Sequence, residues 1–247
     1  MTEFIIVFFA ALIHGALGLG FPMTSTPLLA WQGSLMRAIQ LTLIPTLGVN
    51  VLMIIRQSAP WQALRPFIAI LPAMVAGTLL GSLLVIYLNP KIFRVLLALV
   101  IILFLWLDTR GHLTRVNPDN KPRGVLLAGL VTGFLVGNVN AGVPVLIIFS
   151  LYNQLRRRQS MVLFNSCFLT GKLTQIVLFG SLGILNLQWQ KLGLILLLIA
   201  ISGVLLGQWL GQRLDQARWR MAMRWVLLAI ALSLIFKVAI GHPTSAL

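Results

Sequence analysis

An apolar run interrupted by glycines and prolines constrains this chain more than any other feature. Residues 15–29 read GALGLGFPMTSTPLL, and the run contains Gly15, Gly18, Gly20, Pro22 and Pro27. Glycine frees the backbone, while proline removes a hydrogen-bond donor and disfavours the preceding helical turn. We therefore predict that no continuous helix passes through residues 18–22. Because lipid cannot satisfy open backbone groups, this break must be buried in protein or line a wet cavity.

A second copy of the interruption lies 122 positions further on. Gly137, Gly142 and Pro144 repeat the G-x4-G-x-P spacing of the first copy. Each interrupted segment is either one strongly tilted, kinked helix or a pair of half-helices. Paired glycine and proline interruptions in the two halves of a membrane protein point to a transport site.

The composition places the chain in a membrane. Its 247 residues are 59% hydrophobic and only 9% charged, whereas soluble domains contain about 25% charged residues. The net charge of +15 comes from basic residues between apolar runs, a pattern that indicates membrane orientation and headgroup contacts rather than nucleic-acid binding. The lone Cys167 excludes an internal disulfide, and the scattered His14, His112 and His242 form no metal motif. We expect no metal and no cofactor.

The order of apolar segments predicts an all-α integral membrane protein of two homologous repeats, each with about four segments. Gly77-x3-Gly81 and Gly203-x3-Gly207 match at an offset of 126, and such small-residue faces allow close helix packing. The polar stretch 108–123 divides the chain into a repeat at 1–107, a cytoplasmic linker, and a second repeat at 124–247. The apolar segments are predicted at 2–31, 37–55, 66–88, 90–107, 124–152, 160–180, 192–214 and 218–239.

The lysines and arginines favour the hairpin interpretation of the interrupted segments. If each segment returns to its starting side, 13 basic residues face one side and 5 the other, whereas single crossings give a weaker split of 10 to 8. The two halves are then inverted, and the linker and Arg156 to Arg158 are cytoplasmic. The larger group is Arg56, Arg65, Arg110, Arg115, Lys121, Arg123, Arg156, Arg157, Arg158, Arg213, Arg218, Arg220 and Arg224.

GALGLGFPMTSTPLL and GFLVGNVNAGVPVLIIFS, joined by a polar central loop, resemble the TauE/SafE family of sulfite exporters. The resemblance covers nearly the whole chain. Members of the family usually have a denser run of consecutive glycines after the first glycine. In this sequence that run is reduced to Gly18-Leu19-Gly20, and in the second copy to residues 138–142. The resemblance implies export of sulfite, an organosulfonate or a small organic acid across the cytoplasmic membrane of the cell.

The interrupted segments are the predicted anion site. A half-helix N-terminus offers unpaired N–H groups and a positive dipole end, which can hold an anion without a charged side chain. The glycines serve close helix packing in the competing interpretation. The predicted substrate-binding residues are Gly18, Gly20, Pro22, Thr24, Ser25, Asn50, Asn138, Asn140, Gly142, Pro144, Asn165 and Lys172.

Lys172 supplies the predicted positive charge inside the membrane. It lies 14 residues after Arg158, or roughly 21 Å along a helix. A buried ammonium is costly, and an anionic substrate is its natural partner. In other interpretations Lys172 reaches the interface, or is neutral and held by Asn165 and Gln175. Asn50 occupies the corresponding position 122 residues earlier.

Two questions stay open at this stage. His14 precedes the first break and either carries a coupled proton or only makes structural hydrogen bonds. Broken helices also suit a passive anion channel, whereas a non-transporting accessory subunit would need neither paired breaks nor a buried lysine.

Enzyme motifs such as H-E-x-x-H, G-x-S-x-G and Walker A are absent, so we expect no enzyme. The sequence does not decide between a monomer and a homodimer.

Overall fold

The fold was analysed in a computed structural model, which describes residues 1–30, 32, 34–84, 102, 106, 122–140 and 142–239. Within these residues the secondary structure is helical and contains no strand, which confirms the predicted all-α class. The predicted segment 90–107 and most of the predicted linker fall outside the described residues.

The helices follow the predicted apolar segments, with additional divisions. Helix α8 begins at Pro122, so the last two residues of the predicted linker are helical. The elements are α1 (Thr2–Leu17), α2 (Phe21–Ala30), α3 (Leu35–Leu41), α4 (Leu43–Ile55), α5 (Pro60–Leu64), the 3-10 helix η1 (Arg65–Phe67), α6 (Ile70–Leu84), α8 (Pro122–Val139), α9 (Val143–Tyr152), α10 (Arg157–Ser181), α11 (Leu187–Gly211) and α12 (Gln216–Ala239).

Two predicted segments are bent rather than straight. Segment 37–55 divides into α3 and α4, which meet at a bend of 40°. Before α6 the chain forms α5 and η1, and the bend at that point is 69°. Pro60 and Pro66 lie at the starts of α5 and η1, where proline's missing N–H costs least. The predicted segment starting at residue 66 therefore merged the end of η1 with the longer α6, whereas α5 lies before it, in residues not predicted to be helical.

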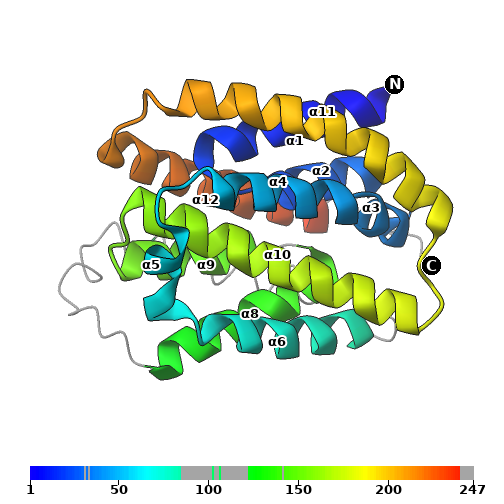
Figure 1. The fold of residues 1–247 in the computed structure, drawn as a ribbon, viewed down its shortest axis with the longest axis horizontal. Coiled ribbons are helices and arrows are strands. Elements are labelled where there is room, and N and C mark those ends of the chain that lie inside the picture. The colour runs from blue at the N-terminus through cyan, green and yellow to red at the C-terminus, as the bar shows by residue number, and fades with distance from the viewer. Residues whose placement is uncertain are drawn as a thin grey trace.

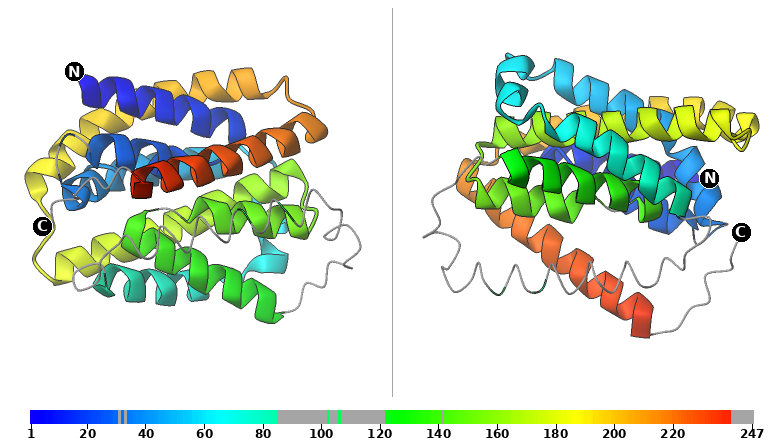
Figure 2. Two further views of the ribbon diagram at one scale, coloured as in Figure 1. Left: turned by 180° about the vertical axis from the view of Figure 1, so that it is seen from behind. Right: turned by 90° about the horizontal axis from the view of Figure 1, so that it is seen from below.

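Both interrupted segments fold back on themselves. In Figure 1 the N-terminus and α3 lie at the right-hand end, so α1 and α2 form a hairpin that returns to its starting end. Helix α8 begins at the left-hand end, and α9 leads back to that end, where α10 begins. The two hairpins thus enter the bundle from opposite ends, as both views in Figure 2 show.

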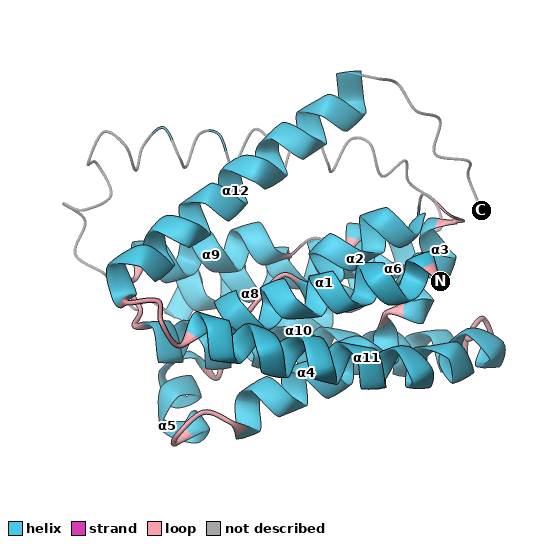
Figure 3. Ribbon diagram, turned by 90° about the horizontal axis from the view of Figure 1, so that it is seen from above, coloured by secondary structure: helices cyan, strands magenta, loops and turns pink. Residues whose placement is uncertain are grey.

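The two ends of the bundle differ in charge. At the left-hand end in Figure 1 lie α5 and the starts of α10 and α12. We call this the arginine-rich end because these segments and the residues next to them contain Arg56, Arg65, Arg156, Arg157, Arg158, Arg213 and Arg218. The opposite end contains α3 and the connection between α10 and α11. Seen from above, α12 crosses one face of the bundle and α5 lies toward the other (Figure 3).

The helices are long and apolar enough to cross a membrane. Helices α10 and α11 have the required length and hydropathy by themselves, and the bent pairs raise the number of candidate spans in the described residues from two to as many as four. Leu194 and Leu198 on α11 are 55% and 69% exposed, although a folded soluble protein rarely exposes a continuous apolar face. These side chains form a surface suited to lipid.

The closest helix contacts cross between the two halves. Helix α6 packs along α8, and α11 packs along α1. A methyl group at Gly77 or Gly81 would overlap the carbonyl oxygen of Leu130 or Phe134 in α8. Equivalent overlaps would occur at Gly203 with Phe8 and at Gly207 with Leu12, so glycine lets both helix pairs approach backbone to backbone.

Candidate functional site

Residues in the left-handed backbone region shape both hairpin tips. Gly18 and Gly20 have φ angles of 84° and 104°, and Asn140 has a φ of 58°. Glycine adopts such angles without strain, and asparagine tolerates them better than most residues. Pro22 and Pro144 each occupy the second position of the following helix, where one N–H has no helical partner in any case.

Lys172 lies against the second hairpin tip and is fully buried. Its Nζ donates hydrogen bonds of 2.6 Å to Asn140 Oδ1 and to Gln175 Oε1. Gln175 Nε2 in turn donates to the carbonyl oxygen of Val136 in α8 at 3.4 Å. Lys172 therefore does not reach toward the interface. Gln175 is one of its partners, whereas Asn165, the other amide considered from the sequence, bonds elsewhere.

The partners of the Lys172 ammonium are neutral amides. Among the described acidic residues, Glu3 pairs with Arg37 and Asp215 with Arg218. Asp108 and Asp119 lie outside the described residues. An ammonium at this position, with amide oxygens as its contacts, would carry a charge that an anion can balance.

Asn140 joins the two hairpins. Its Nδ2 donates a 2.6 Å hydrogen bond to Thr26 Oγ1 in α2, while its Oδ1 accepts from Lys172. All three residues are buried. The side chain of one hairpin tip thereby connects α10 to the returning helix of the other hairpin.

The first hairpin tip is held by His14 and Asn165 instead. His14 Nε2 lies 3.0 Å from Asn165 Oδ1, and Phe21 N–H donates to His14 Nδ1 at 3.3 Å. Asn165 Nδ2 donates to the carbonyl oxygens of Gly18 and Met161. Because Asn165 Oδ1 can only accept and Phe21 N–H can only donate, these contacts fit a neutral imidazole protonated at Nε2. Asn165 precedes Lys172 by seven residues, about 10 Å along α10.

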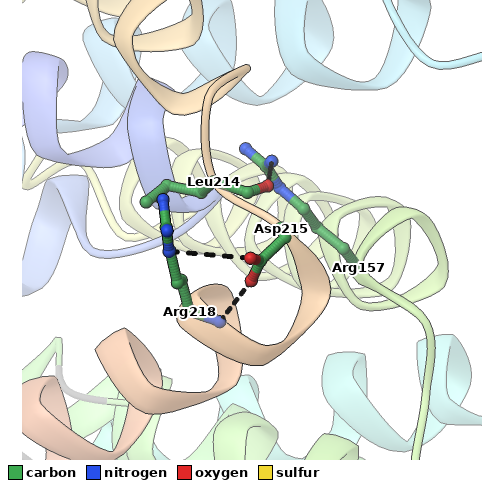
Figure 4. A network of polar contacts seen from close by, with 4 residues as sticks. All are labelled: Arg157, Leu214, Asp215 and Arg218. Atoms are coloured by element: carbon green, nitrogen blue, oxygen red, sulfur yellow. Dashed lines mark hydrogen bonds and ion pairs between the residues drawn. The ribbon is translucent and has the colours of Figure 1, made fainter.

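The end of α1 is capped by side chains from α10 and α12. Arg157 donates to the carbonyl oxygens of Ala16 and Leu214 at 3.1 and 3.0 Å. Trp219 Nε1 donates to the carbonyl oxygen of Leu17 at 3.0 Å. Figure 4 shows Arg157 reaching Leu214, beside the Asp215–Arg218 pair. The last carbonyls of α1 are thereby satisfied, as a buried helix end requires.

Among the described residues, four fully buried side chains have no hydrogen-bond partner for any of their side-chain nitrogen or oxygen atoms. Both side-chain atoms of Asn50 and of Asn138 are unpartnered, as are the hydroxyl oxygens of Thr78 and Thr132. Buried polar groups are usually paired, so each such group needs an explanation. Asn50 and Asn138 were predicted site residues, whereas the two threonines were not. Their position beside glycines in apolar helices is the sequence signal that could have identified them.

The other predicted site residues either belong to the hairpin tips or lie in α2, just after the first tip. Gly18, Gly20, Pro22 and Gly142 belong to the hairpin tips, and the Ser25 hydroxyl donates to the Phe21 carbonyl oxygen within its own helix at 2.7 Å. Thr24 is half-buried, with its Oγ1 near Gly20. Within the described residues no cluster of three or more His, Cys, Asp or Glu side chains could hold a metal ion.

Comparison with known proteins gives one match. A family model described as Sulfite exporter TauE/SafE matches residues 3–234, which include both hairpins and α10. No curated protein and no solved structure matches the chain.

Proposed function

The chain belongs to the sulfite exporter TauE/SafE family, and we propose that it is a secondary transporter that exports a small anion, such as sulfite, an organosulfonate or a small organic acid. Family membership and the apolar helices make it a multi-pass membrane transporter. The proposal adds the anion, the direction and the cytoplasmic membrane as its location, with lipid headgroups contacting the arginine-rich end. It assigns no catalytic activity, cofactor or nucleic-acid partner to the chain.

The buried ammonium of Lys172 is the observation that carries this proposal. Its contacts are amide oxygens of Asn140 and Gln175, and these residues do not compensate the charge of an ammonium group. An anion that enters the site would supply the missing charge and replace part of the lost hydration. We place the anion between the second hairpin tip, α2 and α10, within reach of Lys172.

An inverted repeat would give this site two-sided access. Gly77 and Gly81 of α6 contact Leu130 and Phe134 of α8. The glycines 126 positions later, Gly203 and Gly207 of α11, contact Phe8 and Leu12 of α1, which lie 122 positions before Leu130 and Phe134. A two-fold axis relating the halves produces this exchange of partners. The opposite entry of the two hairpins in Figure 1 favours an axis in the membrane plane.

His14 is proposed to position the first hairpin tip rather than to carry a coupled proton. Both ring nitrogens are already used, one by Asn165 and the other by the Phe21 N–H. Protonation of His14 Nδ1 would place its N–H donor against the N–H donor of Phe21.

A passive anion channel is the second candidate, because pores also use broken helices and helix dipoles. Counterflow in proteoliposomes distinguishes the two. Proteoliposomes that contain a carrier and are loaded with unlabelled sulfite accumulate labelled sulfite transiently and saturably. Proteoliposomes that contain a channel only equilibrate the labelled sulfite. The assay should include methanesulfonate and acetate as competing anions. Absence of movement of all three anions would contradict both candidates and leave a non-transporting membrane subunit.

A further inference from the structure

Two buried threonines differ from the other threonines of the bundle. The hydroxyls of Thr42, Thr46 and Thr174 each donate to the carbonyl oxygen four residues earlier in the chain. This is the usual acceptor for a threonine inside a helix. Thr78 and Thr132 are fully buried, yet their hydroxyl oxygens have no hydrogen-bond partner among the described residues.

Both threonines adjoin the Lys172 network through Val136. A Cβ atom at Gly171, the residue before Lys172, would lie 3.4 Å from Thr78 Oγ1 and 3.1 Å from Val136 Cγ1. A Cβ atom at Gly142 would lie 2.6 Å from Val136 Cγ2 and 2.8 Å from Thr132 Cγ2. The Val136 carbonyl oxygen accepts from Gln175, which itself accepts from Lys172. Thr78, Thr132 and the second hairpin tip thus adjoin Val136, whose carbonyl oxygen accepts a hydrogen bond from the Gln175 that also bonds Lys172.

The chemistry of this region suits an oxyanion. An ammonium group has three donors, and Lys172 uses two of them on the described residues. Each hydroxyl adds a donor, so the region offers positive charge and several N–H and O–H groups. A ligand with several acceptor oxygens can use all of these donors, whereas a cation would be repelled by the positive charge of Lys172.

The arrangement is specific to one side of the repeat. The position matching Thr78 at an offset of 126 is Val204, and the position matching Thr132 at an offset of 122 is Ala10. Both counterparts are buried and apolar. The hydroxyls therefore do not belong to the common scaffold of the two halves.

We infer that Thr78 and Thr132 are substrate ligands, whose hydroxyls donate hydrogen bonds to the oxygens of an oxyanion held by Lys172. This inference rests on the proposed transport function and adds two binding residues to it. It also accounts for the unpartnered state of both hydroxyls, since their acceptor is the substrate.

The test compares valine variants of these threonines with matched controls. Thr78→Val and Thr132→Val keep the side-chain shape and remove the hydroxyl, while Thr46→Val and Thr174→Val remove hydroxyls that bond their own helix. In proteoliposomes with labelled sulfite, we expect Thr78→Val and Thr132→Val each to raise KM about tenfold, because a hydrogen bond to a charged group is lost. The control variants should keep the wild-type KM, and Thr78→Ser should restore most of the affinity.

Thermal unfolding in detergent supplies a second readout. Removal of a hydroxyl without a protein partner should leave the Tm of the ligand-free protein unchanged or higher. The increase in Tm on adding sulfite should shrink in Thr78→Val and Thr132→Val but not in the controls. A lower ligand-free Tm with a normal sulfite response would show that the hydroxyls are structural and would overturn the inference.

The outcomes separate this inference from the proposed function. If wild-type protein transports sulfite, Lys172→Met does not, and both valine variants match the controls, the threonine assignment is wrong and the transport proposal stands. If the wild-type protein transports none of sulfite, methanesulfonate and acetate, both proposals fall together.

Discussion

Lys172 donates a 2.6 Å hydrogen bond to the side-chain oxygen of Asn140, the residue at which the second hairpin turns in the left-handed backbone region. This bond connects the buried charge to the geometry of the hairpin tip. The side-chain nitrogen of Asn140 also donates a hydrogen bond to Thr26 of the first hairpin. Lys172 is therefore connected to both hairpins through Asn140.

Asn140→Asp should inhibit transport by supplying an internal counter-ion. A carboxylate in hydrogen-bond reach of Lys172 would pair with the ammonium in a low-dielectric environment and compete with the anion. We expect at least a tenfold loss of kcat/KM for sulfite with an unchanged or higher Tm. Asn140→Gly is the control, since it keeps the backbone conformation without adding a charge. Equal activity of Asn140→Asp and wild-type protein would contradict a role for the uncompensated lysine.

His14→Leu should destabilise the protein without changing how transport depends on pH. The variant leaves Asn165 Oδ1 and the Phe21 N–H without their partner, and unsatisfied buried groups cost about 1–3 kcal/mol each. Tm values and sulfite transport at pH 6, 7 and 8 measure both effects. Loss of a proton-driven component, with the Tm unchanged, would identify His14 as a coupling residue.

The proposed repeat symmetry predicts matching responses to glycine substitutions. Gly81→Ala and Gly207→Ala each place a methyl group on a carbonyl oxygen, of Phe134 and Leu12 respectively. We expect each to cost roughly 1–3 kcal/mol of stability, as overpacking does. Gly180→Ala is the control, because an added Cβ there meets no atom within 4 Å. A clear loss in only one of the two variants would argue against equivalent packing of the halves.

The arginine-rich end should face the cytoplasm. Ser58 lies at that end and Ser181 at the opposite one, and both are exposed. In a Cys167→Ala background, an impermeant thiol reagent added to intact cells should label Ser181→Cys but not Ser58→Cys. Permeabilised cells provide the control, because both cysteines should then react. Labelling of Ser58→Cys in intact cells would reverse the orientation.

The sequence predicted the helical class and the family because these depend on local and repeating signals. Apolar runs of sufficient length specify helices in a membrane, and the paired glycine and proline motifs carried the resemblance that the family model confirms. The predicted lysine at position 172 is buried, as its depth along a helix implied. The short helix η1 was missed because Pro66 also fits the start of a longer helix, and α5 was missed because its residues lie in a polar stretch that suits a turn.

The partners of the polar residues could not be predicted from the sequence. Asn165 and Gln175 lie on the same helix as Lys172, yet only Gln175 contacts it, because Asn165 faces His14. Thr78 and Thr132 resemble ordinary helical threonines until the absence of their usual acceptor is seen. These relationships depend on how α6, α8 and α10 pack together, and no local pattern encodes that packing.

Sulfite counterflow by Lys172→Met is the most direct test of the anion site. Methionine keeps an apolar stem of similar length and removes the charge, so the variant should insert and fold normally, with a Tm no lower than that of wild-type protein. Lys191→Met, a lysine at the far end of the bundle, is the control for loss of a positive charge. We predict that Lys172→Met abolishes counterflow while Lys191→Met retains it. Wild-type counterflow by Lys172→Met would contradict the proposed anion site, because the anion would then be held without the charge of Lys172.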